Sequence, residues 1–408
     1  MKILVIGASA RAAAQSVRRN HMEVAALDLF VDRDLREISE CESIKKYPDS
    51  IVDQASQWPD HAILFCGGME NVPDVVAKLE KRNTIIGPNS GQMRALRKLS
   101  NWQAWVANSQ DGWLRFPTTY TRQIAKSRIT KDARWLWKPY RSAAGMLIRN
   151  ALLNETLEET SGYLQRWVPG YVLGITFQCL PSNSTVVGVT RNISVNDTRF
   201  GYKEPSDLPP FLYAGSEGMV SISQETSQKL AEWIDAIAIS IEYRGILQAD
   251  FIAGLDGYWY LLEINPRWTA SMEIIEKCTQ LNLINEQLKA QFQLQAPIVS
   301  NSNVPTSKMS AIKYIVYSKE NRVISPDISD MMIAQSNSHT TEASDGSEIV
   351  GWSDIPTPGT VIEANAPIAT AWCSRRTVDR DDSDNGMGHA SGQFYAWPAL
   401  NRLIRTIQ

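Results

Sequence analysis

Two adjacent segments decide the fold of this chain: Gly245-Ile-Leu-Gln-Ala-Asp-Phe-Ile-Ala253 and Tyr258-Trp-Tyr-Leu-Leu-Glu-Ile-Asn265. Each alternates apolar with polar side chains in its central part, which is typical of a β-strand with one buried face. Between them lies Asp256-Gly257, a pair that favours a two-residue hairpin loop. The sequence therefore predicts an antiparallel β-hairpin, with a strand register that this turn determines.

In this register the residue numbers of each facing pair have a constant sum, so Asp250 faces Glu263 and Gln248 faces Asn265. These four polar side chains share one face of the hairpin. The opposite face is expected to be apolar and to pack into the core, through Leu247, Ala249, Phe251, Tyr260, Leu262 and Ile264.

Two carboxylates that face each other across a strand pair repel, so the pairing of Asp250 with Glu263 needs compensation. A hard divalent cation with oxygen ligands supplies it, and the amide oxygen of Asn265 would complete the set. The three residues are thus candidate Mg²⁺ ligands. The alternative is an ordinary solvated face. Exposed faces more often place acids beside bases than two acids beside an amide, which favours the metal site.

Composition and charge restrict the class of protein. The 408 residues suffice for two or three domains, and 43% hydrophobic with 21% charged residues is ordinary for a soluble globular protein. The formal net charge of −3 gives no basic excess that would indicate nucleic-acid binding. An apolar run of about 18 residues and a signal-peptide pattern are both absent from the sequence, so we expect a cytoplasmic protein that does not bind membranes.

The five cysteines and four histidines are scattered along the chain. Without a CxxC spacing or neighbouring histidine pairs they predict neither a zinc site nor a disulfide framework, which fits a reducing compartment. A mechanism centred on histidine is not expected.

The first 90 residues alternate short apolar strands with helices, and the strands are expected at 2–6, 24–29, 61–65 and 84–86. This alternation predicts an open parallel α/β sheet. Gly7 opens a strand-to-helix turn, and Asp28 lies about where a ribose-binding acid stands in a dinucleotide site. A dinucleotide-dependent oxidoreductase is therefore one alternative, although the GxGxxG spacing is not met.

The remainder of the chain predicts mixed helices and antiparallel strands. Residues 91–130 are expected to be helical, with Lys98 inside the first helix, and a helix at 224–243 leads into the hairpin. After about residue 300 the pattern changes to a smaller β-rich unit with a final helix at 398–407.

Lys138 ends a predicted strand and precedes Arg141-Ser142-Ala143-Ala144-Gly145, a loop of mostly small residues. Such a loop lets backbone amides approach phosphate groups, and the lysine adds positive charge. A lysine before a loop is more often simply solvated. The position of Lys138 upstream of a strand–Pro169-Gly170–strand hinge and of the acidic hairpin favours the nucleotide-binding interpretation.

Together these motifs resemble those of the ATP-grasp superfamily, in particular its carboxylate–amine ligase-like members. The resemblance extends over nearly the whole chain and implies a fold of the α/β and α+β classes. It implies an N-terminal pre-ATP-grasp parallel-sheet domain (1–90), a two-lobed ATP-grasp fold (91–300) with a hinge near 165–170, and a small β-rich C-terminal domain (301–408).

The most specific match is Leu262-Glu263-Ile-Asn265-Pro266-Arg267, where the resemblance implies that Glu263 and Asn265 bind Mg²⁺. Asp250 matches the acid on the preceding strand. Arg267 would lie near the transferred phosphoryl group and act in catalysis together with Lys138. The implied ATP-binding residues are Lys98, Lys138, Ser142, Gly145, Gln165, Arg166, Trp167 and Val168. The last four form the hinge, whose backbone would hold the edge of the adenine.

The resemblance implies an ATP-dependent ligase that activates a carboxylate as an acyl phosphate for attack by an amine. ATP and Mg²⁺ would be the cofactors, small-molecule carboxylates and amines the substrates, and a homodimer the assembly. Gly67-Gly-Met-Glu-Asn71 and Trp268-Thr-Ala-Ser271 are similar to a group linked to tetrahydromethanopterin and methanofuran in one-carbon metabolism. That similarity points to biosynthesis of a one-carbon carrier cofactor. The first of these segments is expected either to bind the acceptor or to form a plain turn.

Some residues depart from the pattern of the superfamily. Ala143 and Ala144 stand where many relatives have glycines, and their β-carbons would crowd a phosphate-facing backbone and restrict positive φ angles. Gln165 and Arg166 stand where relatives often carry an acid. A second alternative is therefore an ATP-binding regulatory or scaffolding protein that has lost ligase activity. The retained metal ligands of the hairpin argue against it.

Overall fold

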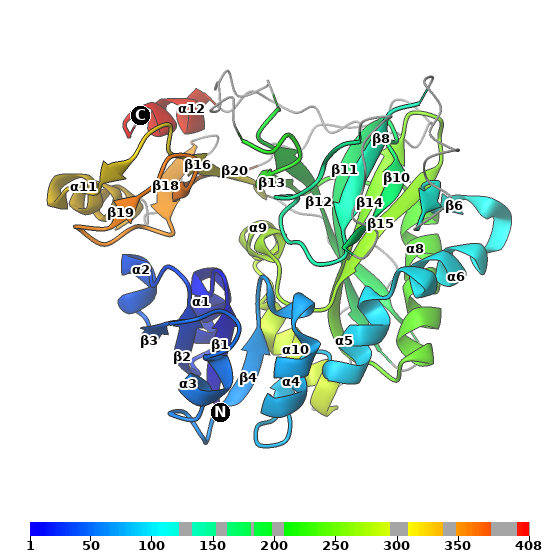
Figure 1. The fold of residues 1–408 in the computed structure, drawn as a ribbon, viewed down its shortest axis with the longest axis horizontal. Coiled ribbons are helices and arrows are strands. Elements are labelled where there is room, and N and C mark those ends of the chain that lie inside the picture. The colour runs from blue at the N-terminus through cyan, green and yellow to red at the C-terminus, as the bar shows by residue number, and fades with distance from the viewer. Residues whose placement is uncertain are drawn as a thin grey trace.

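The computed structural model describes residues 1–121, 133–151, 161–180, 183–197, 208–293, 309–337, 348–376 and 398–407. Within them the chain forms an N-terminal parallel sheet, a large nine-stranded sheet and two small antiparallel sheets (Figure 1). This combination confirms the predicted fold class. Among the described helices, none combines the length and the apolar character needed to cross a membrane.

The N-terminal sheet is parallel throughout and has the strand order β3-β2-β1-β4-β5. Its strands are β1 (Lys2–Gly7), β2 (Glu23–Asp28), β3 (Glu40–Ser43), β4 (Ala62–Phe65) and β5 (Ile85–Ile86). The helices between them are α1 (Arg11–Arg19), α2 (Arg33–Arg36), α3 (Ile51–Ala55) and α4 (Pro73–Leu79), with a 3-10 turn at Met69–Asn71. The sequence predicted all of these strands except β3, which is a polar edge strand without apolar alternation.

The large sheet has the order β18-β20-β16-β13-β12-β11-β14-β15-β6. Its strands are β6 (Leu114–Arg115), β11 (Gly170–Cys179), β12 (Thr185–Ser194), β13 (Tyr213–Gly218), β14 (Gly245–Gly254), β15 (Trp259–Asn265), β16 (Met309–Tyr317), β18 (Ile349–Ser353) and β20 (Pro367–Arg376). Because β16 pairs with β13, the strands from beyond residue 300 extend the sheet that contains the hairpin. The short strands β17 (Arg322–Val323) and β19 (Val361–Ile362) pair separately.

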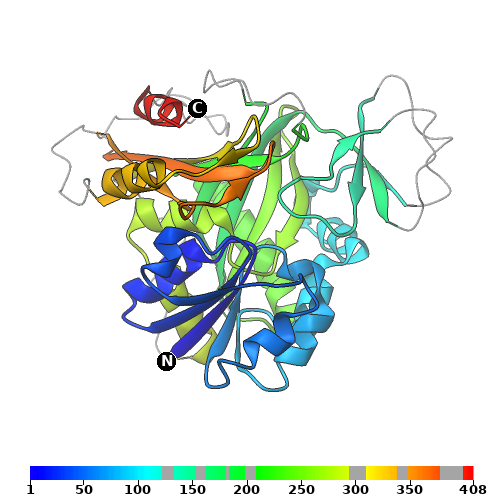
Figure 2. The ribbon, with the colours of Figure 1, turned by 60° about the vertical axis from the view of Figure 1, so that its left-hand side comes forward.

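Helices cover both faces of the large sheet. One face packs against α5 (Ser90–Arg97), α6 (Leu99–Ala107) and α8 (Gln224–Ser240), whose apolar side chains share a core with Phe251. The other face packs against α9 (Ala270–Thr279) and α10 (Leu283–Phe292). These two helices also contact the N-terminal sheet, since Val187 of β12, Ile275 of α9 and Val5 of β1 belong to one core cluster. Helices α11 (Pro326–Asn337) and α12 (Pro398–Arg405) cover the C-terminal strands (Figure 2).

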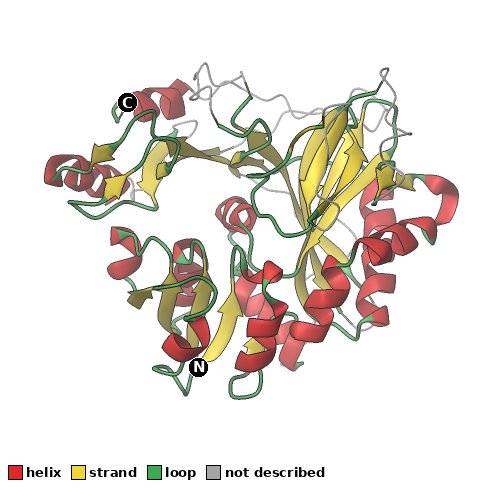
Figure 3. Ribbon diagram, in the orientation of Figure 1, coloured by secondary structure: helices red, strands yellow, loops and turns green. Residues whose placement is uncertain are grey.

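A small lobe projects from the side of the large sheet (Figure 2 and Figure 3). It is an antiparallel sheet in the order β7-β10-β8-β9, built from β7 (Thr119–Tyr120), β8 (Trp135–Pro139), β9 (Arg149–Asn150) and β10 (Gly162–Arg166). Residues 167–169 join it directly to β11, at the position of the predicted hinge. Lys138 therefore lies in the small lobe, and the acidic hairpin lies in the large sheet.

The predicted register of the hairpin is confirmed, since Asp250 faces Glu263 and Gln248 faces Asn265. The hairpin loop that precedes these pairs differs from the predicted one. Gly254 N donates to Tyr258 O at 2.8 Å, so the loop has three residues instead of two. Gly257 occupies the left-handed position of this loop, with φ 84°.

A bulge corrects the one-residue shift that the longer loop introduces. The register changes between Asp250 and Phe251, so that Phe251 faces Leu261 and one residue of β15, Leu262, is extra. Leu261 is therefore fully buried in the core, whereas the sequence predicted Leu262 for that place. The two departures cancel at the acidic end of the hairpin, because each shifts the pairing by one residue.

Candidate active site

The candidate site is centred on the acid hairpin, defined as Gln248, Asp250, Glu263 and Asn265. Both carboxylate oxygens of Asp250 accept hydrogen bonds: Oδ2 from Asn265 Nδ2 at 3.0 Å, and Oδ1 from Gln248 Nε2 at 3.1 Å. Asn192 lies on β12, two strands away from β14 in the sheet, and its Nδ2 donates to Oδ1 of Asp250 at 3.3 Å. The amide oxygen of Asn265 is buried and has no hydrogen-bond partner.

The two facing carboxyl groups differ in their affinity for protons. Burial, and then the negative charge of Glu263, raise the pKa of Asp250 to about 7. Burial also opposes the ionisation of Glu263, but the positive charges of Arg97, Arg267 and Lys138 outweigh it and lower the pKa of Glu263. Near neutral pH the hairpin thus holds one firmly ionised carboxylate and one that a nearby cation would help to ionise.

Basic side chains from two other elements surround Glu263. Arg97, at the end of α5, donates from Nη1 to Glu263 Oε2 at 2.8 Å. Lys138 reaches the site from β8 of the small lobe. Burial lowers the pKa of Lys138 to about 8, although the charges of Glu263 and Asp250 act in the opposite direction. The structure therefore brings Lys138 and the acid hairpin together, as the sequence predicted from their motifs.

Arg267 connects the end of the hairpin to the N-terminal sheet. Its Nε lies 2.8 Å from Oε2 of Glu70, and the Glu70 side chain is only 1% exposed. Next to it, Trp268 N donates to Phe65 O at 2.9 Å, at the end of β4. The carboxylate of the Gly67–Asn71 segment therefore neutralises the arginine that was predicted to act in catalysis.

The predicted phosphate loop after β8 contacts the same segment. Asn71 Nδ2 donates to Ser142 O at 3.3 Å. Ala144 and Gly145 both have positive φ, 55° and 70°. A β-carbon on Gly145 would overlap the carbonyl oxygen of Phe211, so this position requires glycine. Ala144 adopts the left-handed conformation despite its β-carbon, at a cost of about 1–2 kcal/mol.

The hinge residues are largely engaged within the small lobe. Gln165 is buried and its Nε2 donates to Thr119 Oγ1 at 3.1 Å. Arg166 N donates to Thr118 O at 2.8 Å, and Trp167 N donates to Arg134 O at 2.9 Å. A contact with adenine would have to come from the other backbone groups of the hinge, those of Val168 included.

Lys98 does not lie inside a helix, and this prediction was wrong. It separates α5 from α6 with extended backbone angles, and its side chain is exposed. The adjacent Arg97 makes the contact with the hairpin. The sequence analysis also missed Asn192, which a motif search cannot find because its neighbour Asp250 is 58 positions away.

The residues behind the dinucleotide alternative serve the packing of the N-terminal sheet. Asp28 is 1% exposed, and its carboxylate accepts hydrogen bonds from the backbone of Ala10, Phe30 and Val31 at 2.6–2.7 Å. A β-carbon on Gly7 would lie 2.8 Å from the Cys66 backbone. Neither residue has room to bind a ribose or a pyrophosphate, so this alternative loses its support.

The donor atoms of the hairpin fit a hard cation. The described residues contain no group of three or more His, Cys, Asp or Glu side chains suited to a metal ion. The hairpin instead offers two carboxylates and the unpartnered amide oxygen of Asn265. An all-oxygen set of this kind suits magnesium, which commonly takes only one or two protein carboxylates and fills its other positions with phosphate and water.

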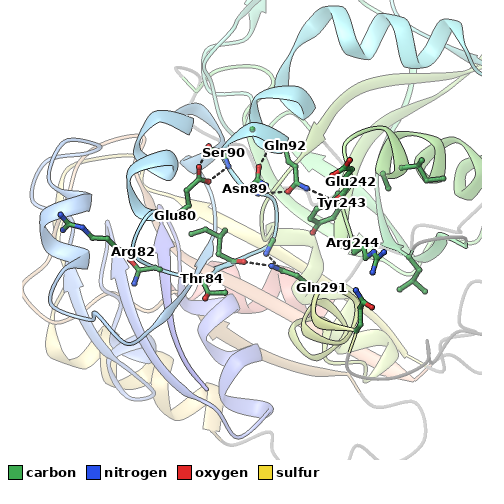
Figure 4. Close-up of a pocket in the computed structure, with 18 residues that line it drawn as sticks. Glu80, Arg82, Thr84, Asn89, Ser90, Gln92, Glu242, Tyr243, Arg244 and Gln291 are labelled. Carbon is green, nitrogen blue, oxygen red and sulfur yellow. Dashed lines mark hydrogen bonds between the residues drawn. The ribbon is translucent and has the colours of Figure 1, made fainter.

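A separate cavity of about 1410 Å³ lies between the N-terminal unit and the far ends of α8 and α10 (Figure 4). Its walls are joined by Gln291, which bonds to Ile85 O and Gly87 N, and by Gln92, which bonds to Ile241 O. None of the predicted site residues lines it. The chemistry predicted from the sequence is therefore not located in this cavity.

Comparison with solved structures shows that the fold is a known one. The fold is similar to that of the biotin carboxylase domain of Hydrogenobacter thermophilus 2-oxoglutarate carboxylase, a dimer in complex with MgADP, ADP and bicarbonate. That match has 14% identity and a TM-score of 0.66, and covers 92% of this chain and 86% of that one. The fold is likewise similar to that of the L-amino acid ligase of Bacillus licheniformis, with 12% identity, a TM-score of 0.63 and coverage of 92% and 93%.

A third similar structure is N5-carboxyaminoimidazole ribonucleotide synthetase from Thermotoga maritima, with 11% identity, a TM-score of 0.59 and coverage of 92% and 94%. The chain therefore has the ATP-grasp fold. Residues 107–271, which include the small lobe, the hinge and the acid hairpin, match the family model of the ATP-grasp domain. No curated protein matches the sequence.

Proposed function

We propose that this protein is an ATP-dependent ligase that activates a carboxylate as an acyl phosphate for attack by an amine. The observation that carries the proposal is the convergence of three basic side chains on the acid hairpin: Lys138 from β8, Arg97 from α5, and Arg267 from the residues directly after β15. Phosphoryl transfer asks a protein mainly to position phosphate groups and to neutralise charge. Clustered basic and acidic groups that surround one point meet that need.

Each residue has a role in this proposal. Lys138 would bind the phosphate oxygens of ATP, with Ser142 and Gly145 holding the loop close to them. Arg267 would stabilise the negative charge that develops on the transferred phosphoryl group. Asp250, Glu263 and Asn265 would hold Mg²⁺, which when bound neutralises charge on the phosphates. Arg97 would keep Glu263 ionised and oriented.

The proposed acceptor site lies at the carboxyl edge of the N-terminal sheet. The strand order reverses between β1 and β4, and ligands of open α/β sheets bind outside the strands at such a point. The Gly67–Asn71 segment follows β4 and contacts the phosphate loop through the bond from Asn71 to Ser142. An acceptor held there would lie beside the activated carboxylate.

Consumption of ATP tests the proposal. Purified protein is incubated with Mg²⁺, ATP and pools of amino acids, amines and one-carbon cofactor precursors, and ADP and phosphate are measured. The Glu263→Gln variant is compared with Glu225→Gln, which removes an exposed carboxylate on α8. We expect substrate-dependent ADP release that falls on the order of 100-fold in Glu263→Gln and is unchanged in Glu225→Gln. ADP release by Glu263→Gln that equals that of the wild type would contradict the proposal. ADP release only with the one-carbon cofactor precursors would support a role in the biosynthesis of a one-carbon carrier cofactor.

A second candidate is an ATP-binding regulatory or scaffolding protein without ligase activity. The observation that favours it is Ala144, a residue with a β-carbon in the left-handed conformation within the proposed phosphate loop. ATP binding without ADP release in any pool would favour this candidate. Light scattering of the same preparation, with and without ATP, tests for the homodimer.

A further inference from the structure

The acid hairpin is contacted by a side chain from a strand that does not neighbour it. Asn192 lies on β12 and Asp250 on β14, with β11 between these two strands. Asn192 Nδ2 still reaches to 3.3 Å from Asp250 Oδ1, because β11 has Gly174 at the position that faces Asp250. A β-carbon on Gly174 would lie 2.7 Å from Gln248 Nε2 and 3.3 Å from Asp250 Oδ1. The missing side chain on β11 therefore leaves the space in which this contact forms.

The contact continues away from the hairpin through side chains of β13. Ser216 Oγ lies 3.5 Å from Asn192 Oδ1, and Tyr213 Oη lies 2.7 Å from Ser216 Oγ. Tyr213, Ser216 and Asn192 are called the donor chain below. Ser216 is fully buried, and the other two residues are half-buried. The donor chain thus connects Asp250 with the beginning of β13.

The direction of these hydrogen bonds is set by Asp250. An ionised carboxylate can only accept, so Asn192 presents its amide nitrogen to Asp250 and its amide oxygen to Ser216. The hydroxyl of Ser216 then donates to Asn192, and the hydroxyl of Tyr213 donates to Ser216. Burial, and the negative charge of Asp250, raise the pKa of Tyr213, so its hydroxyl keeps the proton that it donates. Donors that all point the same way polarise one another and strengthen the last bond, to Asp250.

The backbone of Tyr213 contacts the phosphate loop. Tyr213 N donates to Ala144 O at 2.8 Å. Two positions earlier, the carbonyl oxygen of Phe211 packs against Gly145 of the same loop. On its other side, Tyr213 O accepts from Tyr317 Oη of β16 at 2.8 Å. One residue therefore joins the loop of the small lobe to the acid hairpin of the large sheet.

We propose that Tyr213 is a positioning residue of the ATP site: its hydroxyl orients Asp250 for the metal ion through the rest of the donor chain, and its backbone holds the phosphate loop. The inference rests on the proposed Mg²⁺ site and extends it to β12 and β13. A carboxylate held by fixed donors loses less freedom when a metal binds, so the donor chain raises metal affinity. Loss of the hydroxyl should weaken metal binding and leave the backbone contact with the loop in place.

Binding of Mn²⁺ in the presence of ADP tests the inference without turnover. Mn²⁺ replaces Mg²⁺ at oxygen ligands, and electron paramagnetic resonance measures its free concentration. Tyr213→Phe is compared with Tyr260→Phe, which removes a hydroxyl that bonds to Asp256 in the hairpin loop at 2.6 Å. We expect Tyr213→Phe to bind Mn²⁺ about 3- to 10-fold more weakly than the wild type, the loss that one hydrogen bond accounts for. Tyr260→Phe should match the wild type.

Two further measurements separate positioning from a general structural effect. Calorimetric titration with ADP in EDTA measures nucleotide binding without metal, which should be the same in the wild type and Tyr213→Phe. Ser216→Ala breaks the donor chain at its next member. Because the chain acts as a unit, the double variant should bind Mn²⁺ no more weakly than the weaker of the two single variants. Thermal unfolding verifies that each variant is folded.

Four outcomes overturn the inference: no Mn²⁺ binding to the wild type, equal Mn²⁺ binding to Tyr213→Phe, additive effects of the two substitutions, or a loss of ADP affinity in EDTA as large as the loss of Mn²⁺ affinity. Turnover separates the inference from the proposed function. Mn²⁺ binding that depends on Tyr213, without ADP release in any substrate pool, would leave the role of Tyr213 and remove the ligase. Substrate-dependent ADP release with unchanged Mn²⁺ binding in Tyr213→Phe would leave the ligase and remove the role of Tyr213.

Discussion

At the scale of the residue, the clearest contrast is between Arg97 and Lys98. They are neighbours in the chain, but Arg97 donates to Glu263 at 2.8 Å whereas Lys98 is exposed at the junction of two helices. The motif resemblance selected Lys98 as the nucleotide-binding residue. The geometry instead favours Arg97 as the basic group from this segment that supports the site.

Replacement of each residue by alanine separates these roles. Arg97→Ala leaves the partly buried Glu263 without its nearest positive charge, so we expect ATP-dependent ADP release to fall on the order of 10-fold or more. Lys98→Ala should change it less than about 2-fold, since an exposed lysine contributes little. Steady-state measurement of ADP formation, with circular dichroism as the folding control, provides the comparison. A larger loss in Lys98→Ala than in Arg97→Ala would restore the assignment made from the motif.

The pKa of Asp250 predicts a pH dependence. In the folded protein it is about 7, above the ordinary value of 3.8, because burial and Glu263 disfavour the charged form. The stability that Asp250 contributes is therefore complete below the ordinary value and is lost as the pH rises through about 7. A magnesium ion bound to the ionised form opposes this loss.

We therefore expect magnesium with ATP to raise Tm more at about pH 8 than at about pH 6. Thermal unfolding at both values, with and without magnesium, measures this difference. Asp250→Asn is the control, because it cannot titrate and should show the same small shift at both values. A shift in the wild type that does not grow with pH would argue against Asp250 as a metal ligand.

At the scale of the element, two positions with positive φ require glycine for different reasons. Gly257 (φ 84°) occupies the hairpin loop, where an added β-carbon would meet no atom within 4 Å. At Gly145 (φ 70°) an added β-carbon would overlap the carbonyl oxygen of Phe211. In the hairpin only the backbone conformation requires glycine. In the phosphate loop, close packing requires it as well.

These glycines form a matched pair of variants. Gly257→Ala should lower the free energy of unfolding by about 1 kcal/mol, the cost of the left-handed conformation. Gly145→Ala adds a steric clash and should cost about 2 kcal/mol more, or displace the loop and weaken ATP binding. Urea denaturation and ATP titration of both variants measure these effects. Equal behaviour of the two would mean that the loop does not need its contact with residue 211.

At the scale of the whole molecule, the pair between Arg267 and Glu70 joins the ATP-grasp domain to the N-terminal sheet. Both side chains are poorly exposed, 13% for Arg267 and 1% for Glu70. Loss of one partner of a buried ion pair leaves the other charge without compensation, and that cost is much larger than for a pair in solvent. The pair therefore contributes both to the contact between the two units and to the position of Arg267.

Glu70→Gln tests this contribution. We expect it to lower the free energy of unfolding by about 3–5 kcal/mol. Arg94→Gln, which breaks the exposed pair with Asp74, should cost about 0–1 kcal/mol. Chemical denaturation compares the two variants. A similarly small effect of both would show that Arg267 finds another partner when Glu70 is neutral.

The sequence by itself determined the features that depend on short-range geometry. The pleat alternates side chains between faces and a tight turn sets the pairing, so the hairpin and its facing acids followed from a few consecutive residues. Alternation of strands and helices likewise predicted the parallel N-terminal sheet. The sequence predicted a loop one residue too short, but the acidic pairs were still correct because the bulge at Leu262 compensates for the extra loop residue.

Only the tertiary structure decided which distant groups neutralise those acids. Arg97 is 166 positions from Glu263, and Asn192 is 58 positions from Asp250. The local sequence pattern likewise did not predict that the C-terminal strands join the large sheet through the pairing of β16 with β13. The physical reason is that the alternation of apolar residues specifies which face of a strand is buried, whereas strand order and charge pairing depend on how whole elements pack against one another.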